Sequence, residues 1–226
     1  IDLQNILWTR ARNQPKISQF AQYHFTFNSA ITESKKQTKW TKNILPPPPK
    51  SWNQMLRHQF TEEFENAAKL EYATLKVKET WTYLAESKLP AASELMPFIW
   101  ILSYKYYSDG YLDKFKARLC VRGDLYDSDE DPYAATLASQ SFRAMMAVTS
   151  AHDLELQEYD IVNVFVKAPI RQKVYCYNPR RFEKQQNNEN MILNLRKALY
   201  GFKYSPLYWY EKFVSFLSDQ GLEHGH

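Results

Sequence analysis

Two stretches of the chain alternate with the period of a β-strand and flank a strong turn signal. Residues 98–107 are rich in aromatic and β-branched side chains, and Asp109-Gly110 is typical of a hairpin turn. In residues 111–122, apolar side chains alternate with basic ones. A strand there has one apolar and one cationic face, because successive side chains point to opposite sides. The cationic positions are Lys114, Lys116, Arg118 and Arg122.

The cationic face of this hairpin has two interpretations. Lys and Arg protect an exposed edge strand against aggregation, which is the structural interpretation. A face with several aligned cations also suits a polyanion or a triphosphate. Lys105, on the predicted partner strand, adds a further cation and favours the second interpretation.

Three stretches place apolar side chains at the three- and four-residue steps of a helix. The first covers residues 60–76, where Glu71 falls among the apolar positions. The second covers residues 141–152. The third follows the turn at residues 199–202, has Pro206 in its first turn, where proline is tolerated, and reaches Gly221. For the second helix we expect four side chains to face the interior, namely Phe142, Met145, Met146 and Thr149.

Shorter alternating stretches predict further strands. They cover residues 154–160, 173–177 and 191–196, whereas residues 183–190 are polar and resemble a loop. Helices and strands do not alternate regularly, so the pattern predicts an α+β fold rather than repeated βαβ units.

The N-terminal part has a different character. Residues 1–50 read as a linker or tail, because residues 28–43 are polar and four consecutive prolines follow at 46–49. Such a run forms a polyproline II rod and excludes a helix. We therefore place a folded domain at residues 51–226. The alternative is a proline-capped surface loop within a single domain.

Composition narrows the possible functions of the 226 residues, which carry a net charge of +4. The five glycines form no phosphate-binding loop, and the two cysteines are too far apart for a zinc site. The acidic run 127–131 lacks the glycine and glutamate of a calcium loop and reads as a solvated loop. No apolar run has membrane-spanning length and no signal peptide is apparent, so we expect a reducing intracellular compartment and no membrane partner. The first residue is Ile, which suggests a piece of a longer protein.

Five blocks of residues stand in a particular order along the chain. They are Trp100 with Lys105, Asp109-Gly110, KARL at 116–119 and Gly123; YAATL at 133–137 with Arg143; DIVNVF at 160–165; Val174-Tyr175 with Pro179 and Phe182; and KALYGFK at 197–203 with Ser205-Pro206 and Trp209. Together they resemble the reverse transcriptase of copia-type LTR retrotransposons, an RNA-directed DNA polymerase of the Pol polyprotein. The resemblance covers about residues 51–222 and implies a partial right-hand polymerase, with fingers and an incomplete palm. It implies as partners an RNA or DNA template-primer, a dNTP and the remainder of the polyprotein, in a cytoplasmic particle or the nucleus.

The resemblance also implies roles for particular residues. Asp160 matches the first catalytic aspartate, which binds Mg²⁺ during nucleotidyl transfer. Phe165 matches the residue beneath the incoming sugar, where a bulky ring excludes a 2′-OH. The remaining matches bind the nucleotide: Lys105, Lys116 and Arg118 at the triphosphate, and Tyr200, Gly201 and Lys203 at the nascent base pair and template. Without the resemblance, Asp160 is equally a strand-end salt-bridge partner and Phe165 a core residue.

The chain departs from the family pattern at several positions. Val164 stands where alanine is usual, and Tyr204 replaces a polar or basic residue. Arg181 stands where glycine is usual, so we expect a turn that needs positive φ to be altered. No Asp-Asp pair occurs anywhere, so the second metal motif, apolar-Tyr-x-Asp-Asp, is absent. We expect this chain alone to bind Mg²⁺ weakly or not at all, not to polymerise DNA, and to expose an open sheet edge. The alternatives are a non-enzymatic nucleic-acid-binding remnant that uses hairpin residues 111–122, and an unrelated structural domain.

Overall fold

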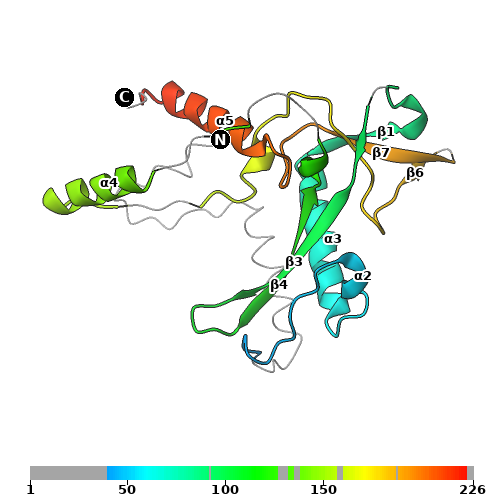
Figure 1. Cartoon of the computed structure of the whole chain (residues 1–226), viewed down its shortest axis with the longest axis horizontal. Coiled ribbons are helices and arrows are strands. Elements are labelled where there is room, and N and C mark those ends of the chain that lie inside the picture. Colours follow the sequence, from blue (N-terminus) through cyan, green and yellow to red (C-terminus); the bar gives the residue numbers. More distant parts are fainter. Residues whose placement is uncertain are drawn as a thin grey trace, which may run out of the picture.

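The structure, a computed structural model, combines helices with two separate β-sheets (Figure 1). This arrangement confirms the predicted α+β class. The acidic run 127–131 lies outside the described residues. The structure describes residues 40–91, 93–126, 132–134, 138–156, 160–186 and 188–222.

The larger sheet is organised around its last strand, β7 (Glu189–Leu195). Its strand order is β1-β7-β5-β2, and β6 (Gln185–Gln186) also pairs with β7. β7 runs antiparallel to β1 (Trp81–Ala85) and to β5 (Tyr175–Cys176), whereas β5 pairs in parallel with β2 (Leu95–Met96). The predicted strands at 173–177 and 191–196 are thus present, the first only two residues long. The expected loop at 183–190 contains the short β6–β7 pairing.

The second sheet is the predicted hairpin, formed by β3 (Phe98–Tyr106) and β4 (Leu112–Val121). Its turn contains Gly110 at φ +83°, a left-handed conformation that glycine adopts without strain. Helix α3 (Thr61–Val77) confirms the first predicted helix and packs its Phe64 ring against Phe115 of β4, with ring centroids 5.1 Å apart. This packing anchors the hairpin to the rest of the molecule.

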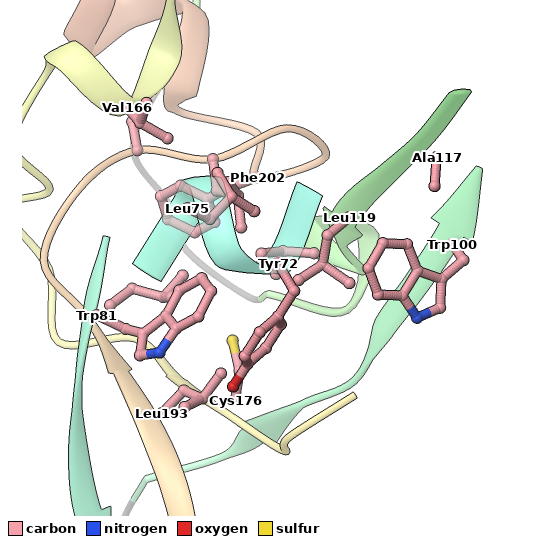
Figure 2. Close-up of a cluster of buried hydrophobic side chains, with 14 of the residues drawn as sticks. Tyr72, Leu75, Trp81, Trp100, Ala117, Leu119, Val166, Cys176, Leu193 and Phe202 are labelled. Atoms are coloured by element: carbon pink, nitrogen blue, oxygen red, sulfur yellow. The ribbon is translucent and has the colours of Figure 1, made fainter. Parts of the chain in front are cut away.

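The hydrophobic core joins α3 to both sheets (Figure 2). The Tyr72 ring of α3 stacks on Phe182 at 4.4 Å and lies 5.1 Å from the Trp81 ring of β1. Leu119 of β4 and Leu193 of β7 are fully buried in the same cluster. The apolar stripe read from the sequence of α3 is therefore the side that carries the core.

The second predicted helix forms, but its expected interior face is exposed. Helix α4 (Ser139–Ala151) lies apart from both sheets in Figure 1. Phe142 is 47% exposed and Met145 44%, while Met146 and Thr149 are half-buried. The inward orientation of these four residues was wrong. Helical periodicity identifies the apolar side of a helix, but it cannot establish that another element covers that side.

The predicted strand at 154–160 is also wrong over its described residues. Residues 154–156 and Asp160 have no strand conformation, and Leu154 and Leu156 are more than half exposed. Alternation gives a strand only where a partner strand accepts its hydrogen bonds, and no described strand pairs with this segment.

The third predicted helix is confirmed as α5 (Ser205–Asp219), with Pro206 in its first turn. A short helix, α2 (Trp52–Met55), begins after Ser51, whose Oγ accepts a hydrogen bond from the Gln54 amide. Single 3-10 turns are η2 (Glu86–Lys88), η3 (Gly123–Leu125) and η4 (Phe165–Lys167).

The first described residues contact the hairpin. The carbonyl of Trp40 accepts a hydrogen bond from the Leu112 amide at 2.8 Å, and its ring lies 5.4 Å from the Phe60 ring. Within the described segments, every helix is too short or too polar to cross a bilayer.

Candidate functional site

Two glycines place the turn before α5 directly on the end of β4. The amide of Val121 donates to the Tyr200 carbonyl at 2.8 Å. Gly201 has φ +84°, and a Cβ there would lie 2.2 Å from the Val121 carbonyl oxygen. A Cβ on Gly123 would lie 2.3 Å from the Gly201 oxygen. Only glycine permits this approach of backbone to backbone, which brings the KALYG segment onto the cationic strand.

The contact assembles three of the predicted nucleotide-binding residues. The Arg118 guanidinium lies over the Tyr200 ring, 4.3 Å from its centroid. The Phe165 ring of η4 meets the same tyrosine edge-on, with centroids 5.0 Å apart. Arg118, Phe165 and Tyr200 thus form one cluster, built from β4, η4 and the turn before α5.

Asp160 lies close enough to this cluster to act on it electrostatically. The pKa of Tyr200 is raised, chiefly by burial; the negative charge of Asp160 adds to the rise and the positive charge of Arg118 opposes it. Asp160 is exposed. The charge of the predicted catalytic aspartate therefore acts on Tyr200, one of the predicted nucleotide-binding residues.

Glu71 of α3 is a member of the site that the sequence prediction missed. Burial raises the pKa of its carboxyl, while a hydrogen bond with the Leu119 backbone and the charges of Lys116 and Arg118 lower it. Glu71 therefore supplies a negative charge beside two of the cations of β4. The sequence contained a signal for this role, because a glutamate among the apolar positions of a helix needs a partner when it is buried.

The cationic face of β4 is partly as predicted. Lys116 is half-buried, and its ammonium pKa is lowered by burial and then by the nearby charges of Arg118 and Lys105. Lys105 stands opposite Lys114 in the register, towards the hairpin turn. Arg122 instead pairs with Asp124 at 2.7 Å.

Lys203 lies in a different environment from the other predicted residues. Its ammonium is 5.2 Å from the Tyr204 ring centroid and 5.8 Å from that of Tyr126. These cation–π contacts place Lys203 on an aromatic group next to α5, not on the Tyr200 ring.

In the part of the chain that the structure describes, no three acidic, histidine or cysteine side chains gather as metal ligands. Mg²⁺ requires octahedral oxygen ligands and is normally held by carboxylates together with waters and substrate phosphates. Asp160, whose side chain is exposed, is one carboxylate of this type.

Comparison with known proteins gives a consistent result. The family described as "Reverse transcriptase (RNA-dependent DNA polymerase)" matches residues 78–226. The chain is 28% identical over 76% of its length to the retrovirus-related Pol polyprotein from transposon TNT 1-94 of Nicotiana tabacum, and 30% identical over 69% to that from transposon RE1 of Arabidopsis thaliana. It spans 13% and 11% of those polyproteins. No solved structure matches the chain.

Proposed function

Because the chain belongs to the copia-type reverse transcriptase family, we propose that it forms the nucleotide-binding part of an RNA-directed DNA polymerase. Its fingers comprise α3 and the β3–β4 hairpin, and the residues around Asp160 belong to an incomplete palm. The chain acts as one segment of an intracellular Pol polyprotein, whose remainder supplies the other parts of the enzyme.

One observation carries this proposal, the Arg118–Tyr200–Phe165 cluster. A guanidinium 4.3 Å above a ring is held in a fixed orientation by the cation–π contact. Arginine in that position offers several N–H donors to phosphate oxygens. The incoming dNTP therefore places its triphosphate at Arg118 and Lys116, and its sugar near Phe165.

Phe165 gives the site its preference for deoxynucleotides in this proposal. Its ring is fixed edge-on against Tyr200 at 5.0 Å, so it cannot move aside easily to admit a 2′-OH. Phe165→Ala removes this barrier. We expect the ratio of ribonucleotide to deoxynucleotide affinity to rise in this variant.

The test is titration of the whole chain with dTTP by calorimetry. Arg118→Gln removes the planar cation, and we expect the dissociation constant for dTTP to rise by about 10- to 150-fold, because charge-assisted hydrogen bonds contribute about 1.5–3 kcal/mol. Lys88→Gln, an exposed lysine of η2, is the matched control for loss of one positive charge. Equal dTTP affinity in wild type, Arg118→Gln and Lys88→Gln would contradict the proposal.

We also propose that this chain alone does not extend a primer. Nucleotidyl transfer uses two metal ions that clamp the attacking and leaving oxygens, and one carboxylate does not hold them. The assay is extension of a DNA primer on an RNA template with Mg²⁺. Extension that disappears with Asp160→Ala would refute this.

A second candidate function is nucleic-acid binding without catalysis. It is supported by the register, which sets Lys105 opposite Lys114 and Ser103 opposite Lys116 on the same face of the hairpin. Binding of an RNA–DNA duplex should weaken linearly on a log–log plot as salt rises. Lys105→Gln should make that slope shallower, whereas Lys88→Gln should not.

A further inference from the structure

Three segments that are distant in sequence meet at the C-terminal end of α3. The Thr80 carbonyl accepts hydrogen bonds from the amides of Arg196 at 2.8 Å and Lys197 at 3.2 Å. The Ala198 amide donates to the Ala168 carbonyl at 2.9 Å. Backbone hydrogen bonds therefore fix the ends of α3, η4 and β7 side by side.

Each of these segments contributes a lysine to the junction. Lys78 is the C-cap of α3, Lys167 ends η4, and Lys197 follows β7. The Lys197 ammonium donates a hydrogen bond to the Lys78 carbonyl. Burial lowers the pKa of the Lys78 ammonium, and the charges of Lys167 and Lys197 lower it further. Lys78, Lys167 and Lys197, named here the lysine junction, thus lie near one another, with Lys78 close enough to both of the others for their charges to act on it.

The positive charge of the lysine junction is not balanced by the ion pairs of the described residues, none of which includes its lysines. The α3 carbonyls carry a partial negative charge that accounts for the position of Lys197. They do not account for Lys167, which comes from another segment. Like charges held together destabilise a fold, and a bound anion would remove this cost.

A hollow lies beside Lys197, one of these lysines. It is open to solvent and has a volume of about 530 Å³. One of its lining residues is acidic, Glu79, so the hollow is mixed in charge rather than uniformly basic. Its lining residues are Glu79, Trp81, Thr82, Arg196 and Lys197.

We propose that the lysine junction is a binding site for a compact phosphoanhydride anion, for which inorganic pyrophosphate is the test ligand. Three ammonium groups from three segments can each donate to a different oxygen of one small, multiply charged anion. A polynucleotide backbone, by contrast, offers one charge per phosphate along an extended line and suits the hairpin face better. The junction thus adds an anion site separate from Arg118.

The location suggests a use within the proposed function, although binding itself does not depend on it. Lys167 follows Phe165 by two residues, and Lys197 precedes Tyr200 by three. A cationic rim next to an active site raises the local concentration of anions and their association rate. Addition of a nucleotide to a primer releases pyrophosphate, which this rim would take up.

The experiment is calorimetric titration of the whole chain with pyrophosphate at low ionic strength. The double variant Lys78→Gln/Lys167→Gln leaves Lys197 and its hydrogen bond to the backbone intact. We expect its pyrophosphate affinity to fall about tenfold, since two exposed charge contacts contribute up to about 1 kcal/mol each. Lys69→Gln/Lys88→Gln removes the same charge from exposed positions elsewhere and should stay within about twofold of wild type.

Comparison with other variants and other ligands makes the result decisive. Equal losses in both double variants, or no measurable pyrophosphate binding by wild type, would overturn the proposal. A loss confined to Lys116→Gln/Arg118→Gln would assign pyrophosphate to the nucleotide site and also overturn it. Loss of oligonucleotide binding alone in Lys78→Gln/Lys167→Gln would identify a nucleic-acid contact instead. If pyrophosphate binds at the junction while Arg118→Gln leaves dTTP binding unchanged, the junction stands and the proposed nucleotide site fails.

The variant should remain folded, which a thermal melt can verify. Lys78→Gln/Lys167→Gln removes two of the three neighbouring positive charges of the lysine junction. Its melting temperature should therefore equal or exceed that of wild type. Pyrophosphate should raise the melting temperature of wild type, because a ligand that binds only the folded state stabilises it, and should raise that of Lys78→Gln/Lys167→Gln less.

Discussion

The contact between Gly123 and Gly201 can be tested by separating its two physical components. An alanine at Gly201 meets the Val121 oxygen at 2.2 Å and also needs φ +84°. An alanine at Gly123 meets the Gly201 oxygen at 2.3 Å, but its φ is outside the left-handed region. An alanine at Gly110 needs φ +83° and meets no atom within 4 Å. Gly201→Ala therefore carries both the clash and the backbone strain, Gly123→Ala the clash alone, and Gly110→Ala the strain alone.

The expected losses of unfolding free energy follow from these environments. A left-handed conformation costs an alanine about 1–2 kcal/mol, and inserting a methyl group into a close-packed contact costs about 1–3 kcal/mol. The entropy lost from the unfolded chain is the same for every Gly→Ala change, so it cancels between variants. Gly201→Ala should thus lose about 2–5 kcal/mol, and Gly110→Ala only about 1–2 kcal/mol.

The measurement is urea-induced unfolding at fixed pH, followed by tryptophan fluorescence. Gly201→Ala and Gly123→Ala should be non-additive in the double variant, because the two positions share one contact. If Gly201→Ala is no less stable than Gly110→Ala, the backbone contact does not position the Tyr200 turn, and the account of the Arg118–Tyr200 cluster is wrong.

Three further results are expected. Cys120 and Cys176 are buried, and burial raises the pKa of Cys120 to about 11 and that of Cys176 further. Iodoacetamide at pH 8 should therefore modify both thiols only after the chain is unfolded in urea. Rapid labelling of the folded chain would contradict this prediction. Burial raises the pKa of Glu71 in the folded state, so the unfolded chain loses this proton first and the free energy of unfolding falls as pH rises above about 4.3. Glu71→Gln should therefore unfold at a higher urea concentration than wild type at pH 7, and this gain should vanish near pH 3. An equal gain at both pH values would refute the prediction. Arg181 has φ +67° and forms an exposed ion pair with Glu65. Both Arg181→Gly and Arg181→Ala lose that ion pair, but only glycine relieves the backbone strain, so Arg181→Gly should be more stable than Arg181→Ala in urea unfolding by about 1 kcal/mol. Equal stabilities of the two variants would count against strain at this turn.

Local signals in the sequence were sufficient for elements whose partners are close in the chain. The Asp109-Gly110 turn and the alternation on either side gave the β3–β4 hairpin, and the helical period gave α3, α4 and α5. Arg181 keeps a positive φ, although its replacement of the family's glycine had led us to expect an altered turn. Such features depend on residues within one or two turns of each other, which a sequence displays directly.

Features that depend on distant partners were harder to predict. The exposed face of α4 and the missing strand at 154–156 have the correct apolar patterns, but nothing in a pattern states whether a partner is present. For the candidate site, the motifs identified Arg118, Phe165 and Tyr200 individually. Their contact requires the approach of Gly201 to Val121, which no periodicity encodes, and the position of Glu71 beside the cations emerges only when α3 packs on β4.

The pairing of the larger sheet has a consequence for the order in which the chain folds. β7 is the common partner of β1, β5 and β6, yet it is synthesised after all of the other described strands. The register joins Trp81 to Leu195, so β1 is synthesised more than a hundred residues before its partner. Pairing at such a separation is slow, and exposed strand edges invite other chains in the meantime. The hairpin can close during synthesis, whereas the sheet must wait, and a nascent chain stalled before residue 189 is the species most in need of a chaperone.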